Sequence, residues 1–256
     1  MRSLLSNLDR LLAPAPDPRR VNWLGDWTYA HRGLHGDGRV ENSPSAFRAA
    51  VAAGVGIECD IQRSRDHEPM VYHDWNFWRL HEYPQEGAML YAAEWRALRY
   101  AHGDEGPMSF SDLVELVAGR VPLLIEIKSG RGYDVERSCE RVIAALAGYT
   151  GRHAVMSFDP RVSRWLRRHS PSTLRGLVMR EDAHGYTQSP WQRHIALWIA
   201  QPDFMAYDVR ALPSAFAGGL RRRGMPLLAW TVNSPATLAK ARAHADAAIA
   251  EGSGLT

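Results

Sequence analysis

The chain has 256 residues, which is long for one ordinary domain, and its 45% hydrophobic content suffices for a large buried core. The formal net charge is only +3, and Arg221-Arg222-Arg223 is the one dense basic run, so a nucleic-acid partner is not expected. No segment is apolar enough to span a bilayer, which argues against stable membrane insertion.

Residues 1–22 predict a short amphipathic lead-in followed by a linker. Leucines recur there at helical spacing, but Asp9 and the proline-rich stretch 13–18 interrupt any apolar run of signal-peptide length. Cys59 and Cys139 have neither a metal-binding nor a redox spacing, which indicates two reduced thiols. We therefore expect a protein of a bacterial cytoplasm.

From residue 23 onward, short apolar runs alternate with helical segments, as in parallel strands joined by helical crossovers. The expected strands are 27–31, 55–61, 121–127, 154–158, 174–179, 204–207, 226–232 and 247–250, and residues 70–73 are expected to form a short extended segment. The expected helices are 45–53, 109–118, 133–147, 160–168, 191–200, 215–223 and 235–243. Roughly eight parallel strands favour a closed TIM (β/α)8 barrel over an open sheet.

One stretch breaks this rhythm. Residues 75–107 are aromatic, mixed in charge and weakly periodic, which predicts an insertion or long loop with a helix at 92–99. The predicted organisation is therefore a lead-in and linker over 1–22, followed by a single α/β barrel domain over 23–256 that carries this insertion.

Three carboxylates stand at strand spacing in two of the predicted strands. Glu58 and Asp60 are two residues apart, so both point to one side of the strand while Cys59 points to the other. Glu126 and Lys128 repeat this spacing on a later strand. If both strands end at one mouth of a barrel, the three carboxylates converge, and their oxygens suit Mg²⁺ or Ca²⁺. The alternative is salt-bridged carboxylates, but buried anions without a cation are costly.

Two histidines, His31 and His73, follow apolar strand residues, where barrel strands deliver catalytic groups. Imidazoles titrate near neutral pH, and two of them on opposite sides of a phosphorus atom can divide the proton transfers of phosphodiester cleavage. Alternatively, each is a structural hydrogen-bonding residue. Asp74 is not expected to orient His73, because adjacent strand residues point apart. The remaining histidines are expected at the surface, among them His35, His67, His81 and His102.

Arg32 and Lys128 are the fixed cations of the same clusters. Either could hold non-bridging phosphate oxygens, the arginine in bidentate fashion, or each could neutralise a neighbouring carboxylate. Gly33 is expected to permit a tight turn where the strand ends. Ser43-Pro44 predicts a helix start with Ser43 as the cap, which leaves Glu41-Asn42 unexplained.

Together these motifs resemble the glycerophosphodiester phosphodiesterase family, from about residue 27 to near the C-terminus. The matching runs are Ala30-His31-Arg32-Gly33, Glu41-Asn42-Ser43, Glu58-x-Asp60, His73-Asp74, Glu126-Ile127-Lys128, Ser157-Phe158 and Trp230-Thr231-Val232-Asn233. The resemblance implies a TIM barrel with a small insertion after the second catalytic histidine. The site residues that it implies are His31 and His73 as the acid/base pair, Glu58, Asp60 and Glu126 as ligands of a divalent metal ion, and Arg32 and Lys128 on the phosphate.

The same resemblance implies that Phe158 and Trp230 line the substrate pocket, although both could equally be barrel core. The predicted function is metal-dependent hydrolysis of a small-molecule glycerophosphodiester to glycerol 3-phosphate and an alcohol. One alternative is a lysophospholipase D or sphingomyelinase D-like enzyme acting on lysolipids. The toxin-like branch commonly has aspartate as the third metal ligand, so Glu126 counts against it. A non-catalytic barrel that only binds phosphodiesters would not need all seven polar residues.

Overall fold

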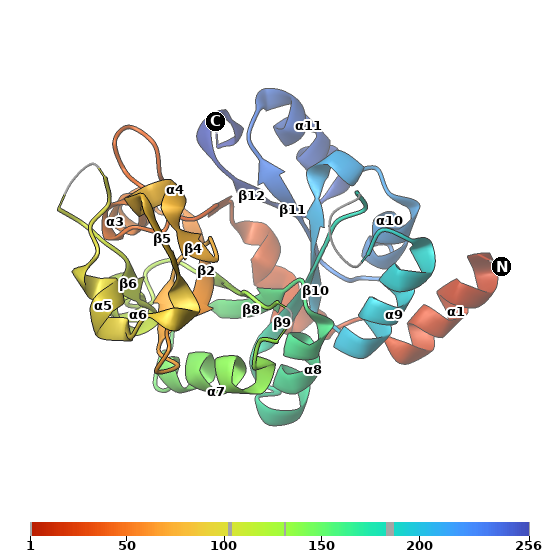
Figure 1. The fold of residues 1–256 in the computed structure, drawn as a ribbon. Coiled ribbons are helices and arrows are strands. Elements are labelled where there is room, and N and C mark those ends of the chain that lie inside the picture. Colours follow the sequence, from red (N-terminus) through yellow and green to blue (C-terminus); the bar gives the residue numbers. More distant parts are fainter. Residues whose placement is uncertain (1, 102–103, 131, 183–186, 256) are drawn as a thin grey trace. The chain divides into compact units, whose positions relative to one another are not determined.

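The computed structural model of the chain describes residues 2–101, 104–130, 132–182 and 187–255. Two compact units are present, one formed by Ala30–His153 and the other by Met1–Tyr29 together with Ala154–Thr256. Figure 1 labels helices and strands of both units. None of the described helices is long and apolar enough to cross a membrane.

The unit Ala30–His153 is built on strand β2 (Gly56–Arg63), which runs parallel to β7 (Leu123–Ile127) and antiparallel to β3 (Pro69–Val71). A short strand, β6 (Met108–Ser109), pairs antiparallel with β3. All five residues of β7 are buried, as its largely aliphatic sequence predicts, and Glu126 is the one carboxylate among them. The helices of this unit outside the inserted segment are α3 (Pro44–Ala52), α6 (Phe110–Val117) and α7 (Val135–Ala145).

Local capping explains where two of these helices begin. Ser43 accepts a hydrogen bond from the amide of Ala46 at the start of α3, and Pro44 occupies the first turn, as the sequence predicts. Ser109 and Asp112 form a reciprocal capping box at the start of α6. The buried faces of the two helices consist of Ala46, Phe47 and Ala50 in α3 and of Phe110, Leu113 and Val117 in α6.

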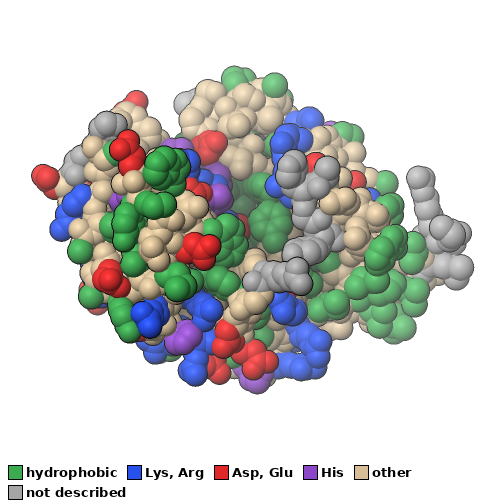
Figure 2. Space-filling model, in the orientation of Figure 1, with side chains coloured by type: hydrophobic (Ala, Val, Ile, Leu, Met, Phe, Trp, Pro, Cys, Tyr) green, Lys and Arg blue, Asp and Glu red, His purple; other side chains and the backbone are tan. Residues whose placement is uncertain are grey.

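The segment between β3 and β6 has more regular structure than the sequence predicts. Strands β4 (Asn76–Phe77) and β5 (Tyr83–Glu86) form an antiparallel pair around α4 (Trp78–His81), followed by α5 (Ala92–Ala97). Figure 2 shows hydrophobic side chains on its surface; the exposed ones are Trp75, Trp78, Tyr83, Met89 and Tyr91. Because the strands are so short, no alternating pattern marks them in the sequence.

A small aromatic core supports this inserted segment and includes Tyr72, Phe77 and Trp95. His81 is half-buried against this core, contrary to the surface position predicted for it. Its ring stacks on Tyr100 with a centroid distance of 4.9 Å, and its Nδ1 donates to the carbonyl of Arg99. Contacts far apart in the sequence produce this burial, so no local pattern reveals it. His102 lies outside the described residues.

The other unit alternates strands and helices in chain order. Its strands are β8 (His153–Ser157), β9 (Leu174–Met179), β10 (Phe204–Asp208), β11 (Leu227–Val232) and β12 (Ala247–Ala250), and each pairs in parallel with the next. The helices between them are α8 (Pro160–His169), α9 (Pro190–Ala200), α10 (Ala215–Arg221) and α11 (Pro235–His244). Before β1 (Tyr29–Ala30) the chain forms α1 (Arg2–Leu12), α2 (Pro18–Val21) and a 3-10 turn, η1 (Asn22–Asp26).

Strands β1, β2 and β7 to β12 give the chain the order of a (β/α)8 barrel, in which an α-helix follows each of them up to β11. The α/β fold class predicted from the sequence, a TIM barrel, is therefore confirmed. In this class catalytic groups come from the carboxyl ends of the strands and from the loops that follow them.

Candidate active site

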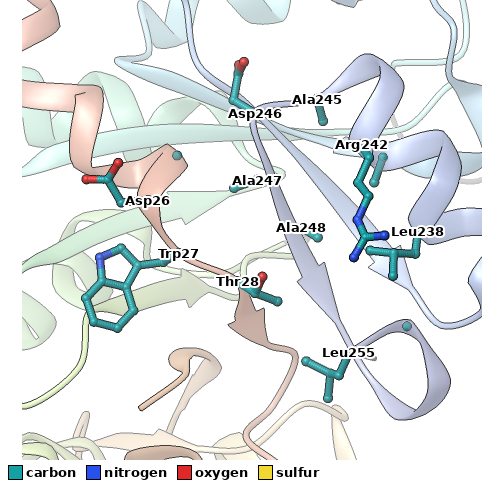
Figure 3. Close-up of a pocket in the computed structure, with 13 residues that line it drawn as sticks. Asp26, Trp27, Thr28, Leu238, Arg242, Ala245, Asp246, Ala247, Ala248 and Leu255 are labelled. Atoms are coloured by element: carbon teal, nitrogen blue, oxygen red, sulfur yellow. The ribbon is translucent and has the colours of Figure 1, made fainter. Parts of the chain in front are cut away.

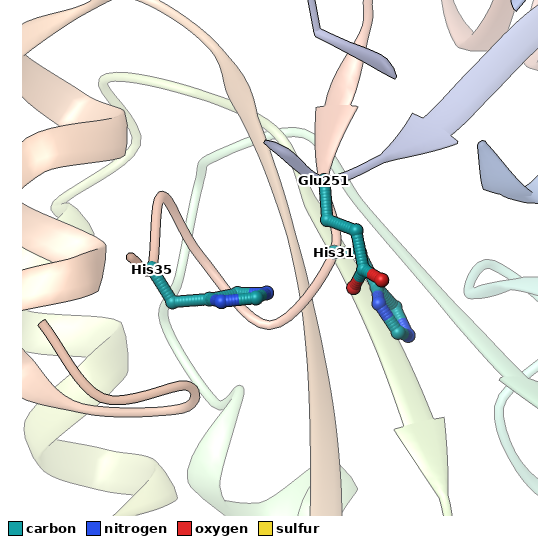
Figure 4. Close-up of side chains that lie close together, drawn as sticks. All are labelled: His31, His35 and Glu251. Carbon is teal, nitrogen blue, oxygen red and sulfur yellow. The ribbon is translucent and has the colours of Figure 1, made fainter. Parts of the chain in front are cut away.

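The turn after β1 places the first group of polar residues. Arg32 has φ 57° and Gly33 φ 79°, so the chain reverses within the left-handed region. A Cβ at position 33 would come within 3.0 Å of Ala46 and Phe47, which leaves room only for glycine. The amide of Arg32 donates to Oε2 of Glu58 at 3.0 Å, and His31 and His35 project from the same segment (Figure 4).

The three predicted metal-ligand carboxylates come together in the unit Ala30–His153. Parallel pairing of β2 with β7 places Asp60 opposite Glu126. One oxygen from each of Glu58, Asp60 and Glu126 lies within 4.8 Å of the others, and the three residues are at most 7% exposed. Three buried carboxylates form a hard oxygen donor set of the kind that binds Mg²⁺ or Ca²⁺.

Their pKa values show how strongly these charges interact. Burial, followed by the charges of Asp60 and Glu126, raises the pKa of Glu58 well above its ordinary value. Burial also acts to raise the pKa of Asp60, but the charges of Lys128 and Arg32 outweigh it and hold that pKa well below its ordinary value. The cluster thus combines one strongly ionised carboxyl with one that resists ionisation, and a bound cation would favour the charged form of both.

Both fixed cations contact this cluster. Lys128 Nζ lies 2.7 Å from Oδ1 of Asp60 and 2.6 Å from Oε1 of Glu126. Arg32 Nε lies 3.3 Å from Oδ2 of Asp60, and its NH1 donates to Glu41 at 2.8 Å. Of the two roles considered from the sequence, neutralisation of neighbouring carboxylates is therefore present in the structure. Phosphate binding stays a prediction, with which these positions are compatible.

Asn42, which the helix-start motif left unexplained, supports the same cluster. Its φ of 54° is in the left-handed region, where asparagine is enriched. Its buried Nδ2 donates to Oδ2 of Asp60 at 2.9 Å, while its amide donates to the carbonyl of Arg32 at 2.9 Å. The run Glu41-Asn42 before a helix cap was the signal in the sequence, but its partners are too distant in the chain to be inferred.

The prediction that Asp74 does not orient His73 is wrong. Strand β3 ends at Val71, so both residues lie in a bend where strand alternation does not apply. Nδ1 of His73 donates to Oδ1 of Asp74 at 2.7 Å, which leaves Nε2 as the nitrogen available for proton transfer. Burial acts to raise the pKa of Asp74, but hydrogen bonds from His73 and Arg79 hold it well below its ordinary value.

The sequence analysis did not identify Arg79, in α4, as a site residue, because it lies inside the inserted segment. Its Nε donates to Oδ2 of Asp74 at 2.7 Å. Its NH1 and NH2 donate to the two oxygens of Glu41 at 3.0 and 2.7 Å. Glu41 is therefore held by both Arg32 and Arg79. Burial acts to raise the pKa of Glu41, but the hydrogen bond from Arg79 and the charge of Arg32 outweigh it and lower that pKa.

Phe158 and Trp230 belong to the other unit. Phe158 directly follows β8 and Trp230 lies in β11, with their rings edge to face at a centroid distance of 5.3 Å. Both side chains are partly exposed, unlike the fully buried core around them. A role in lining the pocket stays a prediction for these two residues.

Each unit contains a cavity, and of these two only the first is lined by a residue next to the predicted site. One of about 440 Å³ is lined by Arg63, Trp75, Glu86, Ala88, Gly130 and Tyr133 and includes the residue after Asp74. Another, of about 350 Å³, lies between α11, β12 and the segment before β1 (Figure 3). Its Asp246 accepts hydrogen bonds from Arg221 and the amide of Leu227, each at 2.8 Å, so this carboxylate serves the fold.

A barrel that brings buried carboxylates, two fixed cations and an oriented histidine to its strand ends has the equipment of a phosphoric diester hydrolase. The family model described as the glycerophosphoryl diester phosphodiesterase family matches residues 31–251, and the chain belongs to that family. This confirms the resemblance seen in the sequence and the expected enzyme class. A sequence comparison with curated proteins finds no match.

Solved structures share the fold at low sequence identity. A phosphodiesterase from Oleispira antarctica, in complex with the product sn-glycerol-3-phosphate, is 18% identical with a TM-score of 0.75, over 88% of this chain and 92% of that one. A glycerophosphodiester phosphodiesterase from Thermotoga maritima is 21% identical with a TM-score of 0.71, over 87% and 93%. One from Parabacteroides distasonis is 18% identical with a TM-score of 0.72, over 88% and 92%.

Proposed function

We propose that this enzyme hydrolyses glycerophosphodiesters to glycerol 3-phosphate and an alcohol with the help of a divalent metal ion. The observation that carries the proposal is the cluster of Glu58, Asp60 and Glu126, whose oxygens lie within 4.8 Å of one another in a buried setting. Family membership and a similar structure described with sn-glycerol-3-phosphate support the choice of substrate. The metal would be Mg²⁺ or Ca²⁺, because all three donors are hard oxygens.

In the proposed reaction, water adds its hydroxyl to phosphorus and the bond from phosphorus to the alcohol oxygen breaks. His31 and His73 divide the two proton transfers, one taking a proton from water and the other giving a proton to the departing oxygen. A metal ion, when bound, supplies charge neutralisation and polarises the phosphate. Through its Nδ1 bond to Asp74, His73 keeps Nε2 available for its share of this work.

The two fixed cations would hold the non-bridging oxygens of the phosphate. Arg32 and Lys128 are already attached to Asp60, and their side chains are only 17% and 13% exposed, so they are restrained before substrate arrives. Such preorganised cations stabilise charge that develops in the transition state without paying for reorientation. Phe158 and Trp230 would line the pocket beside the substrate.

The test measures release of glycerol 3-phosphate from glycerophosphocholine, glycerophosphoethanolamine and glycerophosphoglycerol, with Mg²⁺, with Ca²⁺ and with excess EDTA. We expect metal-dependent release that falls at least about 100-fold in His31→Ala and in Glu58→Gln. Glu68→Gln is the matched control, since Glu68 pairs with Arg141 outside the cluster and should leave the rate unchanged. A folded, metal-loaded enzyme that cleaves none of the three would contradict the proposal, and lysolipids would be assayed next.

A further inference from the structure

We propose that Arg79, in the inserted segment, is a positioning residue for His73. The inference deepens the proposed function and rests on its assignment of His73 to proton transfer. Arg79 would act through Asp74, without touching the substrate. The inserted segment would thereby contribute a residue that orients the catalytic histidine.

The contacts form one continuous chain of hydrogen bonds. His73 Nδ1 donates to one oxygen of Asp74 at 2.7 Å, and Arg79 Nε donates to the other oxygen at 2.7 Å. A carboxylate held at both oxygens cannot rotate about its terminal bond without breaking one of these hydrogen bonds. The ring plane of His73 is therefore fixed by the position of Arg79.

Arg79 is itself fixed at the end away from Asp74. Its two terminal nitrogens bind the two oxygens of Glu41 at 3.0 and 2.7 Å, in the planar bidentate geometry that only arginine provides. Glu41 also accepts from Arg32 at 2.8 Å, and the amide of Arg32 donates to Glu58. The chain thus extends from His73 to the carboxylate cluster, so two parts of the site are tied to each other through the inserted segment.

Stability of the fold does not account well for this arrangement. The side chain of Arg79 is 46% exposed, and ion pairs at such positions contribute little to stability. The same unit offers a comparison in Arg141, which is 44% exposed and pairs with Glu68 at 2.9 Å, away from the cluster. Arg79 differs in bridging two carboxylates, one of which holds a catalytic histidine.

The experiment compares Arg79→Gln, Arg79→Lys and the control Arg141→Gln in the full-length, metal-loaded enzyme. We expect kcat to fall about 10- to 100-fold in Arg79→Gln with KM changed less than about threefold, because orientation is lost while phosphate contacts remain. Arg79→Lys should not restore kcat, since an ammonium group cannot bridge both carboxylates. Arg141→Gln should match the wild type, and thermal midpoints should establish that every variant is folded.

A double-mutant cycle separates positioning from a general effect on the fold. Arg79→Gln and Asp74→Asn should be strongly non-additive in kcat, whereas Arg79→Gln and Arg141→Gln should be additive. The His73→Ala variant is assayed first and should be inactive. Given that result, the inference would be overturned if Arg79→Gln kept the wild-type kcat, or if the effects of Arg79→Gln and Asp74→Asn on kcat were additive. An inactive wild type, or an active His73→Ala variant, would instead contradict the proposed function on which the inference rests.

Discussion

Lys128 is one of only two lysines in the chain, and its ammonium group lies between two buried carboxylates. With a side chain only 13% exposed, it has little contact with water, and its charge is compensated by Asp60 and Glu126. Burial acts to lower its pKa, but these two carboxylates outweigh burial and raise it. Removing the ammonium would leave two anions in a buried setting with one fewer counter-charge.

Substitution of Lys128 by methionine should therefore destabilise the metal-free enzyme. We expect the free energy of unfolding in EDTA to fall by about 3–5 kcal/mol, the usual result of removing one partner of a buried pair. Urea denaturation measures this change. Lys240→Met is the matched control, since Lys240 is half-buried in α11 of the other unit, and we expect a change within about 0.5 kcal/mol. Equal effects of the two substitutions would argue against the role given to Lys128.

At the scale of elements, the inserted segment depends on its own aromatic core. Trp95 is fully buried, and its Nε1 donates to the carbonyl of Gly87 at 2.9 Å. A Cβ at position 87 would come within 2.3 Å of the Trp95 ring, so close approach of backbone and indole requires glycine. The segment carries Arg79, and we expect this packing to be needed to keep Arg79 in contact with Asp74.

His81 makes the stability of the inserted segment dependent on pH. Burial lowers its pKa from about 6.5, against the opposing effect of its hydrogen bond to Arg99. His81 therefore binds a proton more tightly in the unfolded segment than in the folded one. The contribution of neutral, buried His81 to the stability of the segment is complete above about pH 6.5 and is lost as the pH falls through the lower pKa of the folded state. Amide hydrogen exchange in residues 76–97 should accelerate below pH 6.5 relative to β7.

The control for this effect is His81→Phe, which keeps a ring against Tyr72 and Tyr100 but cannot bind a proton. In this variant the exchange rates of the segment, corrected for intrinsic chemistry, should be independent of pH between 7.5 and 5.5. If the variant and the wild type respond equally to acid, another group controls the opening of the segment.

For the molecule as a whole, metal binding at the carboxylate cluster would increase the stability of the folded state. Burial, followed by the charges of Asp60 and Glu126, raises the pKa of Glu58, and a divalent ion bound among the three carboxylates would offset their repulsion in the folded state only. A ligand present at 100 times its dissociation constant stabilises the folded state by about 2.7 kcal/mol. In a chain of this size that corresponds to roughly 5–10 °C in the thermal midpoint.

We therefore expect the midpoint to rise with Mg²⁺ or Ca²⁺ and to fall back on addition of EDTA. Calorimetric scans of the wild type and of Glu126→Gln test this expectation. The variant should lose most of the metal-dependent rise, since one of three ligands is replaced by a neutral amide. A rise of the same size in Glu126→Gln would place the bound metal elsewhere in the protein.

Much of this architecture follows from local patterns in the sequence. Aliphatic runs such as that of β7 and caps such as Ser43 and Ser109 indicate strands and helix starts, because these depend on residues close together in the chain. The spacing of Glu58 and Asp60 likewise places both carboxylates on one side of a strand. The fold class, and the placement of Glu58 and Asp60 on one side of a strand, could therefore be predicted from the sequence.

Other features were decided only by tertiary structure. The pairing of β2 with β7 sets Asp60 opposite Glu126, and register between strands more than sixty positions apart is a non-local property. The bond from His73 to Asp74 depends on where β3 ends, and Arg79 meets Glu41 across a separation of 38 residues. Local sequence determines which side chains are available and how strands and helices begin, whereas distant packing decides which charges meet, because those contacts depend on backbone paths that no short segment specifies.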